Sequence, residues 1–194
     1  MAMYLCNGGK SGGRACIADF DFTTGTSDSS GNNFKITVGG GASRDSEGYH
    51  LNNYNSNIKV TEFPGWSGLN FDIELDFGDY NIASPYTYNV FVGFSGFNGL
   101  VYKNGKGFGI MTSSSTDPQS YASDTNINTF KNSTMRFVAN GRNYKVYKNG
   151  DLFLDYNAPA DRPASGFALG NTTSSNATPR GLIIKAFRIY LNSK

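Results

Sequence analysis

Apolar and polar residues alternate strictly over residues 69–77, where every odd position is apolar and every even position is polar. Successive side chains of a β-strand point to opposite faces of the sheet, so this pattern predicts a strand with one buried and one wet face. Residues 88–94 repeat the alternation with Tyr88, Val90, Val92 and Phe94. We therefore expect a chain built largely from half-buried strands.

Further β-rich runs follow at short intervals, at residues 135–138, 144–147, 152–154 and 166–169. Residues 182–190 are apolar at both parities, which predicts a strand buried on both faces. Between these runs lie Asn-Gly dipeptides at 98–99, 104–105, 140–141 and 149–150, which favour the type I′ turns of β-hairpins. Many short strands joined by such turns predict a sandwich or a barrel.

The composition supports a single β domain and does not favour binding to strongly charged partners. Only 16% of the 194 residues are charged, and Gly, Tyr and Phe are abundant. The net charge of +2 does not favour nucleic acid, and no apolar run reaches the ~20 residues needed for membrane insertion. Residues 1–17 are Gly-rich and are expected to form an arm outside a single domain at 18–194.

The first residues bear on where the protein is made. The run from Met1 to Leu5 is too short for a signal-peptide core, so we expect synthesis in a cytoplasm without a secretion signal. Met1-Ala2-Met3 could also be a cloning junction that replaces a removed signal, which would make the protein extracellular. Cys6 and Cys16 could pair in an oxidising compartment, or stay free thiols in a cytoplasm.

The order of several motifs resembles the concanavalin A-like, laminin-G-like jelly rolls. Residues 20–22 followed by Asp28-Ser29-Ser30-Gly31-Asn32 are similar to the opening strand and turn of that family, and residues 71–75 to an early core strand. Residues 136–150, ending in Tyr-Lys-Asn-Gly, residues 169–171 and residues 181–190 resemble its later hairpin, short strand and closing strand.

This resemblance implies an all-β fold of two antiparallel sheets, the jelly-roll sandwich. Domains of this family bind glycans or protein ligands, sometimes with calcium, and occur in microbial surface proteins and phage virion appendages. The family also includes glycosidases, so the fold by itself does not decide the function.

Three carboxylates of the alternating strand, Asp72, Glu74 and Asp76, lie on one expected sheet face. The related glycosidases carry a Glu-x-Asp-x-x-Glu run, whereas the last Glu is missing here. We expect these side chains to pair with Lys or Arg of neighbouring strands on a solvated face. His50 is the only histidine, and no Gly-x-Ser-x-Gly elbow occurs, so we expect no catalysis.

Sugar binding needs aromatic faces and polar groups in loops or at strand ends. The candidate ligand-binding residues are Tyr49, His50, Asn52, Asn53, Tyr54, Trp66, Tyr80 and Tyr86, although any one of these aromatic rings could instead fill the core. No cofactor is required, but calcium could bind Asp19, Asp21 and Asp28 near the opening turn. Alternatively, Asp28 caps that turn.

The leading hypothesis is a non-catalytic, lectin-like virion structural protein, such as a phage fibre, tail or capsid appendage. Its arm would dock on another virion protein, its sandwich would face host-surface glycan, and symmetry favours a homo-oligomer. The alternatives are a carbohydrate-binding module of a secreted microbial protein, a glycoside hydrolase or lyase, or a purely structural subunit that cements its neighbours.

Overall fold

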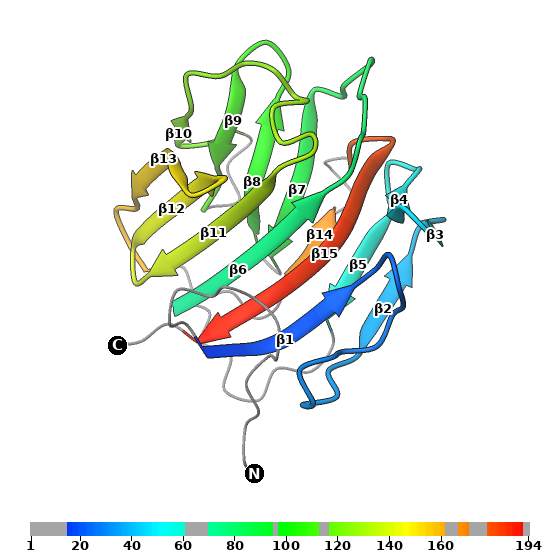
Figure 1. Cartoon of the computed structure of the whole chain (residues 1–194). Coiled ribbons are helices and arrows are strands. Elements are labelled where there is room, and N and C mark those ends of the chain that lie inside the picture. The colour runs from blue at the N-terminus through cyan, green and yellow to red at the C-terminus, as the bar shows by residue number, and fades with distance from the viewer. Residues whose placement is uncertain are drawn as a thin grey trace.

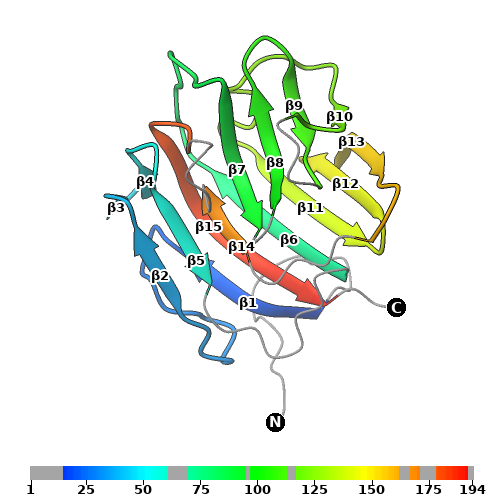
Figure 2. The same cartoon turned by 180° about the vertical axis from the view of Figure 1, so that it is seen from behind.

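The structure is a computed structural model that describes residues 15–60, 70–94, 97–112, 117–161, 167–170 and 178–191. These residues form strands and turns, arranged as two antiparallel sheets packed face to face (Figures 1 and 2). Among them, no helix is long and apolar enough to cross a membrane. The predicted all-β, two-sheet antiparallel sandwich is confirmed.

Sheet A is the layer nearer the viewer in Figure 1. Its strands are β1 (Ala15–Asp21), β3 (Ser43–Asp45), β4 (Gly48–Leu51), β6 (Asn70–Phe77), β11 (Thr134–Asn140), β12 (Asn143–Lys148), β13 (Asp151–Asn157) and β15 (Leu182–Leu191). Their order is β13-β12-β11-β6-β15-β4-β3. On the side of β15 away from β6, β4 pairs with its first residues and β1 with the rest.

Sheet B lies behind sheet A in Figure 1 and in front of it in Figure 2. Its strands are β2 (Ile36–Gly39), β5 (Asn57–Val60), β7 (Tyr88–Phe94), β8 (Phe97–Lys103), β9 (Gly107–Ile110), β10 (Ser120–Tyr121) and β14 (Phe167–Gly170). Their order is β10-β9-β8-β7-β14-β5-β2. The runs predicted at 135–138, 144–147 and 152–154 are therefore strands of sheet A, and the described part of 166–169 belongs to sheet B.

The core between the sheets is rich in aromatic rings. The odd-numbered side chains of β6 all point inward, as the alternation predicts, and are buried. Rings from opposite sheets meet there: Phe71 lies 5.0 Å from Phe94, and Phe77 lies 6.1 Å from Phe91, between ring centroids. Such contacts hold β6, in the middle of sheet A, rigidly against sheet B.

β-bulges explain two places where the burial of side chains differs from that predicted by the sequence pattern. In β15 the pairing register shifts between Ile184 and Ala186, so even-numbered residues face the core before the shift and odd-numbered ones, such as Phe187, after it. The inward side chains of the strand are buried, and on its outer face Ala186 and Tyr190 are buried as well, while Ile183, Lys185 and Arg188 are half-buried. The predicted burial on both faces is thus confirmed in part. In β7 a shift after Val90 leaves Val90 in a small cluster apart from the main core, while Val92 lies in that core.

The Asn-Gly dipeptides at 104–105 and 149–150 lie in the turns of the hairpins β8–β9 and β12–β13, as predicted. At 140–141 the hairpin β11–β12 also forms, but Asn140 is the last residue of β11 and the turn consists of Gly141 and Arg142. Only Asn149 and Gly150 both have positive φ, the requirement of a type I′ turn. The dipeptide at 98–99 lies inside β8, contrary to the prediction. Gly99 is needed there for packing, because a Cβ atom would lie 2.2 Å from the Phe94 ring.

The sandwich begins a little before the boundary expected at residues 17 and 18. β1 starts at Ala15, and the side chains of Cys16 and Ile17 are buried. Cys16 is disulfide-bonded in the structure. The rest of the expected arm, residues 1–14 with Cys6, lies outside the described residues.

Candidate functional site

Polar side chains line the outer face of sheet A in rows that the strand register creates. Glu74 of β6 lies opposite Arg188 of β15 and, on its other side, opposite Arg136 of β11. The same row continues to Asp19 of β1 beyond Arg188 and to Tyr147 of β12 beyond Arg136. Five strands thus present negative and positive groups alternately, ending in an aromatic ring.

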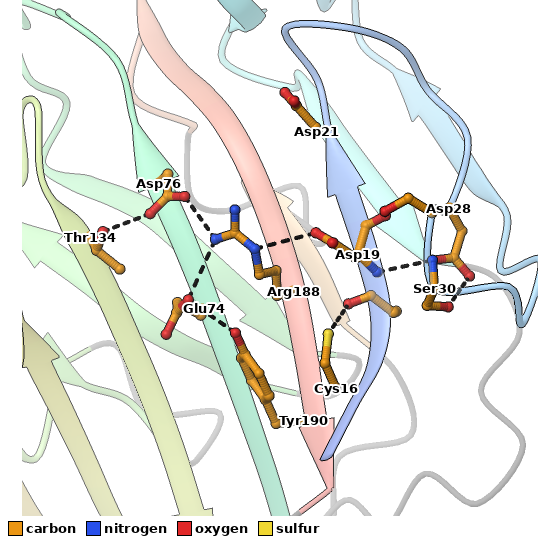
Figure 3. Close-up of polar contacts among 12 residues, drawn as sticks. Cys16, Asp19, Asp21, Asp28, Ser30, Glu74, Asp76, Thr134, Arg188 and Tyr190 are labelled. Atoms are coloured by element: carbon orange, nitrogen blue, oxygen red, sulfur yellow. Dashed lines mark hydrogen bonds and ion pairs between the residues drawn. The ribbon is translucent and has the colours of Figure 1, made fainter. Parts of the chain in front are cut away.

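Arg188 joins three carboxylates from two strands, and Figure 3 shows its guanidinium between them. Its Nε lies 3.2 Å from Asp19, and its Nη1 lies 2.7 Å from Asp76 and 3.4 Å from Glu74. Burial lowers the pKa of Arg188, but the hydrogen bond and charge of Asp76 and the charge of Asp19 outweigh burial and raise it above its usual value. Thr134 completes the group by donating to Asp76 over 2.6 Å.

A second ion pair lies along the same face. Arg136 donates two hydrogen bonds to Asp72, 2.8 Å from Nε and 2.7 Å from Nη2, in the planar fork geometry that suits arginine and carboxylate. Asp72 is only 1% exposed, and the Arg136 guanidinium lies 5.4 Å from the ring centroid of Tyr147. The predicted pairing with a basic residue of a neighbouring strand is confirmed, but Asp72 itself is buried rather than solvated.

Two adjoining depressions lie over these rows, with volumes of about 520 and 430 Å³. They share Thr134 and Asn149, and we call them together the sheet A groove. The first is lined by Asp21, Thr23, Asp76, Phe77, Asn132, Ser133, Thr134, Asn149, Lys185, Ala186 and Arg188, and the second by Glu74, Thr134, Arg136, Tyr147, Asn149 and Gly150. Each volume lies within the roughly 300–1,000 Å³ typical of small-molecule sites.

The wall of the groove at Asn149 is set by the turn between β12 and β13. Asn149 adopts φ 51°, and its side-chain oxygen accepts a hydrogen bond from the Thr134 backbone N–H at 2.9 Å. Its own N–H donates to the Thr134 carbonyl at 2.8 Å. The turn is therefore tied to β11 on both sides, and the groove is preformed.

Asp21 forms the opposite rim of the groove, at the end of β1. Its carboxylate accepts hydrogen bonds from the Thr23 hydroxyl at 2.6 Å and from the Thr23 N–H at 3.0 Å. The hydroxyl bond is the main reason that the pKa of Asp21 is lowered. Asp21 is exposed and therefore carries a full negative charge at the mouth of the groove.

The candidate ligand-binding residues do not gather at one place. Tyr80 is 1% exposed and packs edge to face on Phe77, and Tyr49 is buried against Phe22, so both rings belong to the core. His50 points outward from β4 and bonds Asp45 at 2.9 Å. Trp66 lies outside the described residues.

The remaining candidates lie in loops at one rim of the sandwich. Asn52 and Asn53 bond the neighbouring β2–β3 region, through Ser43 and the Gly40 carbonyl. The carbonyl of Tyr54 accepts from Thr178 at 2.8 Å, and the exposed Arg180 stacks 5.3 Å from the ring of Tyr86. The segment that leads into β15 thus brings Tyr54 and Tyr86 to one rim, apart from the sheet A groove.

The three aspartates proposed for calcium have other partners. Asp28 accepts hydrogen bonds from the backbone N–H groups of Asp19, Ser30 and Phe34 and from the Ser30 hydroxyl (Figure 3). This is the turn-capping role weighed as the alternative. Asp19 pairs with Arg188, and Asp21 holds Thr23. No group of three or more His, Cys, Asp or Glu side chains in the described part of the chain is arranged to hold a metal ion.

Sequence reasoning missed Thr134, Arg136, Tyr147 and Arg188 as groove residues. Each occupies a position whose side chain faces outward in a strand that was predicted. The two arginines could have been identified from the sequence, because outward positions opposite an acidic strand favour basic partners. The sequence does not reveal the order of the strands in the sheet, and that order brings residues 74, 136 and 188 into one row.

No model of a known protein family matches this chain, and no curated protein matches its sequence. Among solved structures, Trypanosoma rangeli sialidase in complex with 2,3-difluorosialic acid is similar with a TM-score of 0.62 at 13% identity. The similarity covers 90% of this chain but only 30% of the sialidase.

Two further structures match at 22% identity and a TM-score of 0.57. One is domain 4 of AbnA, a GH43 extracellular arabinanase from Geobacillus stearothermophilus, in complex with arabinotriose, where 91% of this chain and 92% of that domain are covered. The other is the receptor-binding domain of botulinum neurotoxin type G, with 90% and 47% covered. By its strand order and these similarities, the chain has a two-sheet antiparallel β-sandwich fold, which is consistent with the predicted jelly roll.

Proposed function

We propose that this protein is a non-catalytic, lectin-like domain that binds glycan in the sheet A groove. The observation that carries the proposal is the preformed array on the groove floor, where carboxylates, arginines and hydroxyls alternate on rigid strands. Sugar hydroxyls both donate and accept hydrogen bonds, so alternating acceptors and donors suit them. Tyr147 adds an aromatic side chain beside this array.

The similarity to an arabinanase domain that was solved with arabinotriose supports a glycan as the ligand. That similarity extends over nearly the full length of both chains. At 22% identity it concerns the fold, so the place of binding on this chain is argued from the groove alone.

The arrangement of the carboxylates favours binding over hydrolysis. A glycosidase needs one protonated carboxyl group and one anionic carboxylate on either side of the scissile bond. Here Glu74 and Asp76 form ion pairs with the same arginine, which suits two anions. Glu74 also accepts a hydrogen bond from the Tyr190 hydroxyl, and Asp76 accepts one from the Thr134 hydroxyl.

A glycan array followed by titration calorimetry with the best ligand tests this function. We expect binding, loss of binding on Arg136→Ala, and no release of reducing ends from the bound polysaccharide. Lys131→Ala, which breaks an exposed ion pair with Asp79 outside the groove, is the control. Cleavage of the polysaccharide that is lost in Glu74→Gln would establish a hydrolase instead.

For the biological setting we propose a phage virion appendage, displayed toward host-surface glycan. The fold and groove fit a subunit that attaches to surface polysaccharide, and antibody labelling of purified particles tests it. Neighbouring portal, capsid or tail genes would support this setting.

A second setting, a carbohydrate-binding module of a secreted microbial protein, is favoured by one specific observation. Cys16 is disulfide-bonded, and disulfides persist mainly in oxidising compartments. A secretion signal encoded upstream of Met1 and neighbouring genes for polysaccharide degradation would support this second setting over the first.

A further inference from the structure

We propose that the sheet A groove selects uncharged saccharides and rejects those that carry carboxylates, such as uronic and sialic acids. This inference rests on the proposed function, because it names the ligand class of the same groove. It follows from the charges on the groove and from how its two arginines are already engaged.

The charged groups that line the groove balance one another. Three carboxylates, Asp21, Glu74 and Asp76, stand against three cations, Arg136, Lys185 and Arg188. Asp72 and Asp19 lie outside the lining and form ion pairs with Arg136 and Arg188 respectively. An incoming anion would therefore meet two arginines whose charge is already compensated.

The two arginines cannot offer an anion the paired donors that bind carboxylates well. A guanidinium recognises a carboxylate best through two parallel N–H donors. Arg136 already uses its Nε and Nη2 in this way on Asp72. Arg188 directs Nε to Asp19 and Nη1 to Asp76, so either arginine would have to break an existing bond to grip a second carboxylate.

Single donors and acceptors remain, and these match hydroxyls. Nη2 of Arg188 donates to none of the described residues, and in Figure 3 it points away from the three carboxylates. Lys185 lines the groove without an ion pair among those residues. On the other side of the groove, Asp21 offers acceptor oxygens that a sugar hydroxyl can use but a carboxylate cannot.

Asp21 is the group with which selectivity can be changed. It is exposed at the mouth, and its carboxylate bonds only the adjacent Thr23 and Thr24 turn, so its replacement leaves the ion-pair rows intact. A like charge about 4 Å away weakens binding roughly fivefold even at the dielectric constant of water, and more in a groove that excludes water. Several carboxylates act together here.

The experiment compares matched neutral and acidic ligands on one array: lactose with sialyllactose, and galactotriose with the trimer of galacturonic acid. We expect the wild-type protein to bind the neutral member of the pair that it recognises at least tenfold more tightly. Asp21→Lys should reduce the ratio of the affinity for the neutral ligand to the affinity for the acidic ligand at least fivefold. Asp161→Lys, which makes the same change of charge at an exposed residue outside the groove lining, should leave the ratio unchanged.

The outcomes separate this inference from the proposed function. Binding that favours the acidic member would overturn the inference and leave glycan binding in place. A ratio that Asp21→Lys and Asp161→Lys change equally would also overturn it, because selectivity would then arise from net charge rather than from the groove. Absence of binding to any glycan, with circular dichroism showing folded protein, would overturn the proposed function itself.

Discussion

Replacing Arg188 by Met should destabilise the sandwich because it removes the cation shared by Asp19, Glu74 and Asp76. Removing one partner of a fully buried ion pair costs about 3–5 kcal/mol. Arg188 is 23% exposed and Asp76 29% exposed, so water reaches part of the network. We therefore expect a loss of about 2–3 kcal/mol in the free energy of unfolding.

Urea unfolding followed by circular dichroism measures this loss. For a domain of this size each kcal/mol corresponds to about 2–4 °C in Tm, so thermal unfolding should shift by about 4–12 °C. Lys145→Met is the matched control, because Lys145 and Asp155 form an exposed pair whose loss should cost less than about 1 kcal/mol.

A second substitution tests whether charge is the cause. Asp76→Asn in the Arg188→Met background removes one of the carboxylates left without their cation, and it should recover part of the stability. The reasoning would be refuted if Arg188→Met were no more destabilising than Lys145→Met, or if the added Asp76→Asn lowered stability further.

Three further predictions concern the scaffold. Gly99→Ala should cost about 1–3 kcal/mol in thermal unfolding, because the new Cβ would overlap the Phe94 ring; a Tm equal to wild type would contradict this packing. Asp28→Ala should lower the free energy of unfolding by about 1.5–3 kcal/mol, because hydrogen bonds to a charged acceptor are lost. EDTA should leave the Tm of the wild-type protein unchanged, and a fall in Tm on chelation would indicate bound calcium. Burial raises the pKa of Tyr80, so the unfolded chain loses the phenol proton at a lower pH than the folded chain does. The free energy of unfolding should therefore fall above about pH 10, and in Tyr80→Phe it should fall less steeply between pH 9 and 11.

Features encoded by neighbouring residues were predictable from the sequence. β6 was recognised because its alternation is local, and three of the four hairpins expected at Asn-Gly dipeptides were found for the same reason. The bulges in β7 and β15 were not predicted, because they arise from how each strand pairs with partners far away in the chain.

The candidate site was harder to predict for a related reason. The sequence around a tyrosine near a strand end does not distinguish a ring that enters the core from one that faces a ligand. The rings of Tyr49 and Tyr80 enter the core. The groove gathers Glu74, Arg136 and Arg188 from three strands, so its existence depends on the order of the strands. Only the tendency of Asp72, Glu74 and Asp76 to find arginine partners was visible beforehand.

The position of β15 bears on how the protein comes to fold. β15 fills the space between β6 on one side and β4 and β1 on the other, yet it follows every other described strand in the sequence. Until it leaves the ribosome, β1 has no neighbour in its sheet among the described residues, and the pairing edges of β6 and β4 stay open. Pairings over such sequence distances form slowly. Closure of the sheet should therefore wait until residues 182–191 have left the ribosome, and a nascent chain stalled before residue 182 should depend on chaperones to avoid aggregation.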